Sequence, residues 1–304
     1  MEKNLSIIVP HYNSPAYLCR LLDSIPMRDD IEIIVVDDRS TEKLEELEEC
    51  KKKYESDNII FITSDSPNKG SGAARNVGIK IAKGKWMIFS DADDVFLEGF
   101  EDVLASYFET DNDIVYFPPT SIKENGEKGD RHIEFANYVR EYAANPEKYE
   151  NELKIRYRYM PPWSKMMKTS FLNKNGLLFD ERMCSEDVMF ACRSAYSAKK
   201  VAASDTSVYC IIDNPGSITA NTDAFKNKSF TEVSIQRYKY LKERLSKKDF
   251  KTLDLAALGR ITLTLRSNMS GKDKREQLKM IFDAHMRIIP RKIFTVKFWR
   301  ERFK

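Results

Sequence analysis

Four short runs of apolar residues recur in the first ninety positions of the chain, and they restrict the folds open to it. The runs cover residues 5–9, 31–36, 59–62 and 86–89. Each is short and almost uniformly apolar, without the strict alternation that a strand with one face in water would show. The pattern therefore predicts strands that other parts of the protein cover on both faces.

Segments with helical periodicity fill the intervals between these runs. Residues 15–25 place leucines on one face, residues 41–54 begin at a capping threonine, Thr41, and residues 72–83 end before the stop signal Gly84. Strand and helix alternate without room for hairpins, which favours a parallel sheet with right-handed crossovers. We expect an α/β fold with a single, mostly parallel sheet flanked by helices.

The second half of the chain has a less regular pattern. Further strands are predicted at residues 113–117 and 208–212, and residues 120–131 form a polar, irregular stretch between them. After about residue 215 the pattern becomes helical and highly charged. The predicted organisation is a main domain over residues 1–215 and a helical C-terminal region over residues 216–304.

Composition excludes several classes of protein. The 304 residues are 42% hydrophobic and 32% charged, as in an ordinary globular chain. No stretch approaches the roughly 18 consecutive apolar residues of a membrane-spanning helix, and the N-terminus lacks the pattern of a signal peptide. The five cysteines form no C-x-x-C pair, so neither a disulfide framework nor a zinc site is indicated. We therefore expect a cytoplasmic protein.

Carboxylates follow two of the predicted strands directly. They are Asp37, Asp38, Asp91, Asp93 and Asp94. Because the carboxyl ends of parallel strands meet at the edge where ligands bind, we expect the two groups to converge. Three carboxylates within four positions repel one another, and a divalent cation is the simplest partner for them. Aspartates are also common in turns for local reasons, so the interpretation depends on the buried strand before them.

The first strand leads into an aromatic segment at the same edge. Tyr12 follows Pro10 and His11, and its ring is placed to stack on a nucleotide base. Neither glycine-rich phosphate motif, G-x-G-x-x-G or G-x-x-x-x-G-K-[ST], is present, so a metal would have to neutralise the phosphates of a ligand. Residues 68–76 provide a glycine-rich approach to a helix N-terminus with two cations, for which a plain surface turn is the alternative.

Five segments along the chain resemble the ordered motifs of a known family. They are Pro10-His11-Tyr12-Asn13, Val36-Asp37-Asp38-Arg39-Ser40-Thr41, Ala74-Arg75-Asn76-Val77-Gly78, Ser90-Asp91-Ala92-Asp93-Asp94 and Ser185-Glu186-Asp187-Val188-Met189-Phe190. The family is glycosyltransferase family 2, the inverting enzymes of the GT-A fold. The resemblance covers roughly residues 4–212. It implies a nucleotide-sugar-binding half at residues 1–105 and an acceptor-binding half at residues 106–215.

The resemblance implies how a nucleotide-sugar donor is held. Tyr12 would pack on the base, Asp38 would bond it, and Asp91 would lie near the ribose. Asp93 would bind a Mn²⁺ or Mg²⁺ ion that also grips the diphosphate. The residues expected to bind the nucleotide-sugar are Pro10, Tyr12, Asp38, Arg75 and Asp91. Asp94 either supports the metal ligand or caps the helix that follows.

The resemblance also implies the catalytic group. Asp187 would be the general base that takes a proton from an acceptor hydroxyl, which attacks the anomeric carbon with inversion. Glu186 would orient the acceptor. Acids in the first turn of a helix are also stabilised by the helix dipole, with Ser185 as the cap, and this is the alternative interpretation. Trp163 is either a platform for the acceptor sugar or a buried structural residue.

Three features depart from the family pattern. Arg39 stands where the family usually has glycine, and Ser185 stands where glycine commonly precedes the Glu-Asp pair. The Gln-x-x-Arg-Trp motif of processive synthases is absent. The missing motif, together with the lack of membrane spans, favours transfer of a single sugar over polymerisation, whereas the first two departures concern the fit of donor and acceptor.

The C-terminal tail is basic and aromatic. Residues 272–304 hold eleven Lys or Arg against four acids, while the remainder of the chain is net acidic. Such a tail suits an anionic membrane surface, although a helix folded back on the body or a dimer contact would also fit. The acidic remainder argues against nucleic-acid binding.

The sequence thus predicts a metal-dependent glycosyltransferase that moves one sugar from a nucleotide donor, a UDP-sugar, to a hydroxyl of a glycan or lipid-linked glycan. The setting expected is bacterial surface polysaccharide synthesis, in the cytoplasm or at the inner face of the membrane. Two alternatives are a sugar-1-phosphate nucleotidyltransferase and a relative that binds nucleotide-sugars without turnover.

Overall fold

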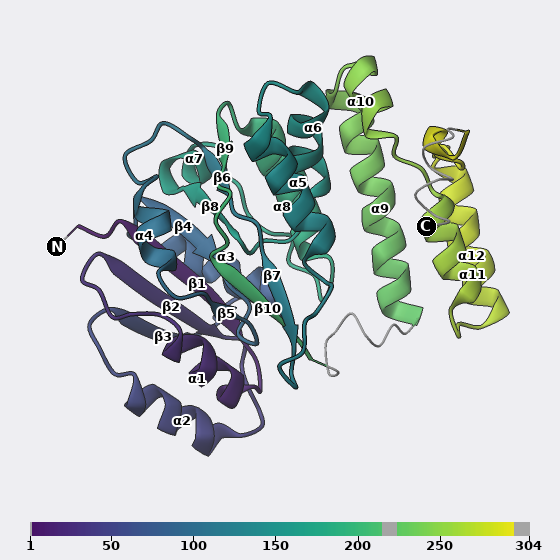
Figure 1. The fold of residues 1–304 in the computed structure, drawn as a ribbon. Coiled ribbons are helices and arrows are strands. Elements are labelled where there is room, and N and C mark those ends of the chain that lie inside the picture. Colours follow the sequence, from purple (N-terminus) through teal and green to yellow (C-terminus); the bar gives the residue numbers. More distant parts are fainter. Residues whose placement is uncertain (1, 215–223, 295–304) are drawn as a thin grey trace. The chain divides into compact units, whose positions relative to one another are not determined.

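The computed structural model describes residues 2–214 and 224–294 of the chain, without the side chains of residues 292 and 294. The chain divides into two compact units, residues 1–215 and residues 216–304. The first unit is an α/β domain and the second is helical (Figure 1).

A seven-stranded sheet forms the centre of the first unit. Its strands, in spatial order, are β3 (Ile59–Thr63), β2 (Ile31–Asp37), β1 (Leu5–His11), β4 (Trp86–Phe89), β8 (Lys165–Lys168), β6 (Ile114–Tyr116) and β9 (Val201–Ala203). β8 runs antiparallel to both of its neighbours, and the other pairings are parallel. The prediction of an α/β fold with a mostly parallel mixed sheet flanked by helices is confirmed.

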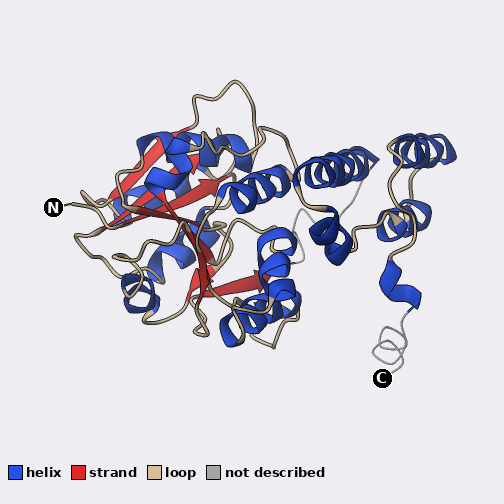
Figure 2. Ribbon diagram, turned by 90° about the horizontal axis from the view of Figure 1, so that it is seen from above, coloured by secondary structure: helices blue, strands red, loops and turns tan. Residues whose placement is uncertain are grey.

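Helices cover both faces of this sheet (Figure 2). The first three are α1 (Pro15–Asp23), α2 (Leu44–Lys53) and α3 (Ser71–Ile81). Alternate residues of β2 explain the two layers. Ile33 and Val35 belong to the main core together with leucines of α1 and α2, while Ile34 and Val36 pack with apolar residues of α3. The strand is apolar from Ile33 to Val36 because neither face meets water there.

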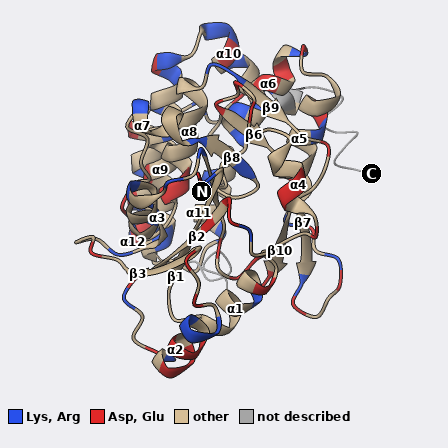
Figure 3. Cartoon of the chain, turned by 90° about the vertical axis from the view of Figure 1, so that its left-hand side faces the viewer, with Lys and Arg blue, Asp and Glu red and all other residues tan. Residues whose placement is uncertain are grey.

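The helix starts follow local chemistry, with one correction. Pro15 occupies the first turn of α1, where its missing N–H costs nothing. α2 carries glutamates in its first turn and lysines in its last, as the helix dipole favours (Figure 3). The prediction that Thr41 caps this helix is wrong: α2 begins at Leu44, and Lys43 precedes it in a left-handed conformation with no side-chain cap.

The remainder of the first unit adds five helices and a second sheet. The helices are α4 (Phe100–Ala105), α5 (Ile133–Ala144), α6 (Tyr149–Arg158), α7 (Thr169–Lys174) and α8 (Glu186–Ser197). The second sheet has three strands in the order β5 (Val95–Phe96), β10 (Tyr209–Asp213) and β7 (Thr120–Lys123).

Three details of residues 106–215 differ from the sequence-based expectations. A single sheet was expected, whereas β10 is not a strand of the main sheet and pairs with β5 and β7 in a second one. β7 lies inside the stretch that was expected to be irregular. The strand was not predicted because the residues at its exposed end are polar and mask the strand pattern. β8 was not predicted, because lysines occupy both of its ends.

The second unit consists of α9 (Ala224–Arg244), α10 (Lys247–Leu253), α11 (Leu258–Arg266), α12 (Gly271–Asp283) and a short 3₁₀ turn, η1 (Arg291–Phe294). Its interior includes a polar contact, in which the Thr231 hydroxyl donates to the side-chain oxygen of Gln277 at 3.1 Å. Among the described residues, no helix is long and apolar enough to cross a membrane. Residues 295–304 of the predicted basic tail lie outside the described residues.

Candidate active site

The C-terminal ends of β1, β2 and β4 meet at one edge of the main sheet. After β1 the chain builds β2 and β3 on one side and then crosses to add β4 on the other, so the direction of winding changes between β1 and β4. Open α/β sheets bind ligands at such a switch point. The structure brings the two predicted carboxylate groups together at this edge, since Asp37 ends β2 and Asp91 follows β4 closely.

Tyr12 lies at this edge with half of its surface exposed, and the residues beside it are firmly held. The buried His11 ring places Nδ1 2.9 Å from Asp37 Oδ1, while its Nε2 accepts a hydrogen bond from the Ser14 amide at 3.2 Å. Nδ1 therefore carries the proton and donates it to Asp37. Burial lowers the pKa of His11, so the ring stays neutral. Pro10, which precedes it, is partly buried.

Asp38 is largely buried and already engaged. Its Oδ2 accepts from the Gly70 amide at 2.6 Å, and its Oδ1 accepts from Arg39 at 3.2 Å. The Arg39 guanidinium also donates to the carbonyl oxygens of Ser66 and Asn68. Arg39 has φ of 61°, a left-handed conformation that favours glycine. This conformation explains why glycine is usual at this position in the resembled family. Here arginine holds residues 66–70 against Asp38.

The three carboxylates after β4 form one cluster. One oxygen from each of Asp91, Asp93 and Asp94 lies within 4.8 Å of the others. Asp94 is buried, and both of its oxygens accept hydrogen bonds: Oδ2 from the Tyr209 hydroxyl at 2.8 Å and Oδ1 from the Ile212 amide at 2.9 Å. Asp94 does not cap the next helix, because α4 begins at Phe100 after Gly99.

Asp93 is the carboxylate of this cluster that accepts no hydrogen bond from another of the described residues; its own backbone amide is its donor. Burial, and next the negative charge of Asp91, raise the pKa of Asp93 to about 6. A carboxylate that is costly to ionise and lies beside two others is suited to a cation. Oxygen ligands of this kind match Mg²⁺ or Mn²⁺. The residues therefore fit the divalent ion that the sequence predicted.

Arg75 joins this cluster to the acceptor side. The side chain is 3% exposed, and it donates to Asp91 Oδ1 at 2.5 Å and to Glu186 Oε1 at 2.8 Å. Glu186 also accepts from the Ser71 hydroxyl at 2.5 Å. The sequence suggested that Arg75 lies near the nucleotide. In the structure it bridges two carboxylates, one after β4 and one in α8, and its place near the nucleotide stays a prediction.

Asp187 stands in the first turn of α8, next to Glu186. The side chain is partly exposed, as a base that meets an acceptor must be. Surrounding protein atoms, and then the charge of Glu186, raise its pKa to about 7, while Arg75 and Lys165 oppose that rise. Ser185 precedes the helix at φ of 60°, and its hydroxyl makes no cap hydrogen bond. The capping alternative for Ser185 is therefore wrong.

Trp163 is 7% exposed and packs inside an aromatic cluster. Its ring stacks on Tyr209 at 5.8 Å between centroids and 12° between planes, and it meets Phe135 and Tyr159 edge-on. This burial favours the structural role for most of the ring. Contact with an acceptor stays a prediction for its exposed edge.

Sequence reasoning missed two residues of this site. Tyr209 was assigned only to a strand, yet its hydroxyl accepts from the Asp91 amide at 3.0 Å and donates to Asp94. The sequence assigned no role to Lys165. In the structure it is 1% exposed, lies near the rings of Tyr116 and Tyr159, and has its pKa lowered to about 7 by burial. The sequence signal for this residue was its position in a segment rich in aromatic residues.

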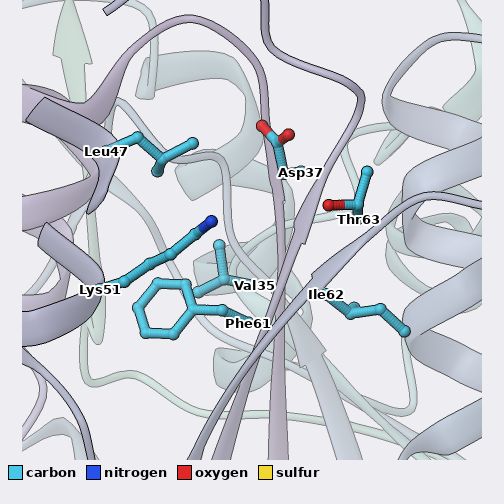
Figure 4. Close-up of a pocket in the computed structure, with 7 residues that line it drawn as sticks. All are labelled: Val35, Asp37, Leu47, Lys51, Phe61, Ile62 and Thr63. Carbon is cyan, nitrogen blue, oxygen red and sulfur yellow. The ribbon is translucent and has the colours of Figure 1, made fainter. Parts of the chain in front are cut away.

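A small cavity lies beside the site and is no candidate for the ligand. Its lining comes from β2, α2 and β3, namely Val35, Asp37, Leu47, Lys51, Phe61, Ile62 and Thr63 (Figure 4). Its volume is about 30 Å³, which is room for a water molecule rather than a nucleotide-sugar.

Comparison with known proteins agrees with this geometry. Residues 6–176, more than half of the chain, match the family model described as glycosyl transferase family 2. The chain belongs to glycosyl transferase family 2. A relative in Bacillus spizizenii, a poly(ribitol-phosphate) beta-glucosyltransferase, is 33% identical over 222 residues, which are 70% of this chain. The chain spans about a third of that relative's length, since the match covers 33% of it.

Solved structures of other glycosyltransferases share the fold. Staphylococcus aureus TarS 1–349 in complex with UDP-GlcNAc matches with a TM-score of 0.71 and 21% identity, over 92% of this chain and 80% of that one. The mannosyltransferase PcManGT from Pyrobaculum calidifontis, in complex with GDP-Man and Mn²⁺, matches with a TM-score of 0.57 and 13% identity, over 94% and 86%. At these identities the likeness supports the GT-A fold alone.

Proposed function

We propose that this family 2 protein transfers one sugar from a nucleotide-sugar donor, a UDP-sugar, to a hydroxyl of a glycan acceptor. The observation that carries the proposal is the Arg75 bridge, which joins Asp91 of the carboxylate cluster to Glu186 beside the candidate base. Donor-side and acceptor-side groups thus belong to one site. The complex of TarS with UDP-GlcNAc and the named activity of the Bacillus relative support this choice.

The donor would bind along the edge formed by residues 1–105. The exposed Tyr12 ring stacks on the base, with Pro10 shaping the same wall. Asp38 offers its remaining lone pairs to the base, since Arg39 and the Gly70 amide hold it in a fixed orientation. Arg75 acts on the nucleotide through Asp91, whose second oxygen faces the ribose.

Asp93 would hold a divalent cation, Mn²⁺ or Mg²⁺. Such an ion supplies charge neutralisation for the departing nucleoside diphosphate. Asp93 is suited to this role because it has no hydrogen bond to another described residue to give up and its pKa is raised to about 6. Asp94 keeps the turn in place and is not assigned as a ligand.

Asp187 would act as the general base and Glu186 as the residue that orients the acceptor. With a pKa raised to about 7, Asp187 binds a proton more readily than an ordinary aspartate at the moment when the acceptor hydroxyl attacks. Attack from the side opposite the diphosphate inverts the anomeric carbon. Trp163 would contact the acceptor through its exposed edge, within the half formed by residues 106–215.

The acceptor proposed is a surface polymer rich in hydroxyl groups, of the poly(ribitol-phosphate) type that the Bacillus relative is named for, or a lipid-linked glycan. We propose that the reaction takes place in the cytoplasm, at the inner face of a bacterial membrane. The basic C-terminal residues would add attraction to anionic lipid or to a polymer of phosphates.

Binding of nucleotide-sugars with and without metal tests the proposal. Isothermal calorimetry with UDP-glucose, UDP-GlcNAc and GDP-mannose should detect binding of a UDP-sugar in Mn²⁺ and loss of that binding in EDTA. Asp93→Asn in Mn²⁺ should fail to bind the UDP-sugar, as the unaltered protein does in EDTA. Asp111 is an exposed acid away from the site, so Asp111→Asn should bind the UDP-sugar normally. Absence of binding by every donor, or release of pyrophosphate from UTP and a sugar-1-phosphate, would overturn the assignment.

A further inference from the structure

The carboxylate turn and β10 are joined through one buried phenol. Tyr209 is fully buried at the start of β10, and its hydroxyl is surrounded by groups of the turn that follows β4. It accepts a hydrogen bond from the Asp91 amide at 3.0 Å and donates one to Asp94 Oδ2 at 2.8 Å. A hydroxyl has one proton and two lone pairs, so these two contacts leave one lone pair of the Tyr209 oxygen. The Ser90 hydroxyl oxygen lies 3.3 Å from the Tyr209 hydroxyl oxygen and can donate to that lone pair.

The same strand engages the second oxygen of Asp94. The Ile212 amide donates to Asp94 Oδ1 at 2.9 Å. Both oxygens of this carboxylate are therefore directed at β10, and Asp94 is 3% exposed. Asp93, the neighbour in sequence, has no such contact among the described residues. The two adjacent aspartates thus differ in environment: Asp94 is hydrogen-bonded to β10, whereas Asp93 is left for a ligand.

The ring of Tyr209 is fixed by separate contacts. It stacks on Trp163 in the acceptor-side half, at 5.8 Å and 12°, and it meets Phe96 edge-on at 5.4 Å. Both contacts are independent of the hydroxyl. A change to phenylalanine would therefore remove the two hydrogen bonds and preserve the packing, which allows the two contributions to be measured apart.

We propose that Tyr209 and Asp94 are positioning residues for the cation site, in which the hydroxyl of Tyr209 holds Asp94 and the Asp91 amide so that Asp93 is presented to the metal. This inference rests on the proposed function for the identity of the ligand. It assigns Asp94 a role that the sequence left open, and it makes β10 of the second sheet a part of the donor site.

The turn needs this support because of its charge. Asp94 is 3% exposed, and one of its oxygens lies within 4.8 Å of carboxylate oxygens of Asp91 and Asp93. Without the two donors from β10, the Asp94 carboxylate would lack partners in a buried place, and it would either shift toward water or compete with Asp93 for the ion. The hydroxyl of Tyr209 prevents both outcomes, since it satisfies Asp94 and anchors the backbone of Asp91 at once.

Three variants test the proposal by Mn²⁺ binding, measured from the electron paramagnetic resonance signal of free Mn²⁺ with and without UDP. Asp93→Asn should abolish binding. Tyr209→Phe should weaken it roughly tenfold, the order expected for loss of hydrogen bonds to a charged group. Asp94→Asn should weaken it no more than Tyr209→Phe does, and the double variant should be no weaker than Tyr209→Phe alone, because both changes act on the hydrogen bond between the Tyr209 hydroxyl and Asp94. Tyr142→Phe, which removes a buried hydroxyl contact to the Val201 carbonyl, is the matched control.

Amide hydrogen exchange adds a readout that needs no ligand. In the metal-free protein, Tyr209→Phe should accelerate exchange at the Asp91 amide, whereas Tyr142→Phe should leave it unchanged. Equal Mn²⁺ affinity in Tyr209→Phe and the unaltered protein would overturn the inference, and so would complete loss of binding in Asp94→Asn, which would make Asp94 a direct ligand. Failure of the unaltered protein to bind Mn²⁺ with UDP would instead count against the proposed function, and the exchange result would still decide whether Tyr209 holds the turn.

Discussion

Arg75 and Asp91 form an ion pair between a buried arginine and a partly exposed aspartate, with the guanidinium Nη2 2.5 Å from Asp91 Oδ1. The same guanidinium reaches Glu186, and Asp187 is a further negative neighbour. One cation thus compensates three acids that come from the two halves of the domain. Burial alone would lower the pKa of Arg75, but these acids raise it, so the charge is retained.

Removal of this cation should destabilise the domain and stop donor binding. Arg75→Met leaves the largely buried Glu186 and the partly exposed Asp91 without their cation, and such a change costs up to about 3 kcal/mol. We expect a clear fall in the thermal unfolding midpoint and a smaller fall for Arg75→Lys. Arg28→Met, which breaks a partly exposed pair with Asp30, should cost less than about 1 kcal/mol. Equal midpoints for Arg75→Met and Arg28→Met would contradict this account.

Arg39→Gly should weaken donor binding by roughly three- to tenfold, the order of one or two hydrogen bonds. The change removes the guanidinium that holds residues 66–70 against Asp38, while glycine relieves the left-handed backbone. The unfolding midpoint should therefore stay close to that of the unaltered protein. Calorimetric titration with the UDP-sugar measures the effect. An unchanged dissociation constant would show that Arg39 does not set the position of Asp38.

Gly72→Ala should impair both folding and transfer. A Cβ atom at Gly72 would lie 2.4 Å from the Asp180 carbonyl oxygen and 2.8 Å from Glu186 Cβ, so the segment that leads into α8 would have to move. Gly259→Ala is the control, because nothing lies within 4 Å of a Cβ there and alanine favours the helix by up to about 1 kcal/mol. Circular dichroism and transfer assays on both variants check this. Full activity of Gly72→Ala would contradict the close contact.

The transfer rate should rise with pH through about 7, because Asp187 must be ionised to act as a base. Lys165 lowers the pKa of Asp187 through its positive charge, so Lys165→Met should move this rise to higher pH and reduce the rate below neutrality. At high pH the two proteins should converge. Profiles of kcat/KM against pH measure the shift. Lys168→Met, on the same strand but bonded to the Thr110 carbonyl, should leave the profile unchanged.

The donor side of the fold follows from the sequence because its signals are local. The strands β1 to β4 are apolar on both faces, and each ends in the polar residues that meet at the sheet edge, as Asp37 and Asp91 do. Sequence order alone was enough to predict that these residues converge. The family resemblance added the roles proposed for Asp93 and Asp187.

The acceptor side could not be predicted in the same way, because its contacts are non-local. β8 has lysines at both ends, and Lys165 is buried only because tyrosine rings surround it. Tyr209 acts 118 residues away from Asp91, a separation that no local pattern reveals. Asp94 and Asp93 are identical in type and adjacent, so only their partners in space distinguish them.

The most direct test of the account compares donor binding with turnover in Asp187→Asn. Asparagine keeps the size of the side chain and cannot take the proton. Calorimetry with the UDP-sugar and Mn²⁺ should give the dissociation constant of the unaltered protein, while sugar transfer to poly(ribitol-phosphate) should fall by at least about a hundredfold, as expected when a general base is lost. Transfer within a few-fold of the unaltered protein, with donor binding intact, would contradict the assignment of Asp187 as the base.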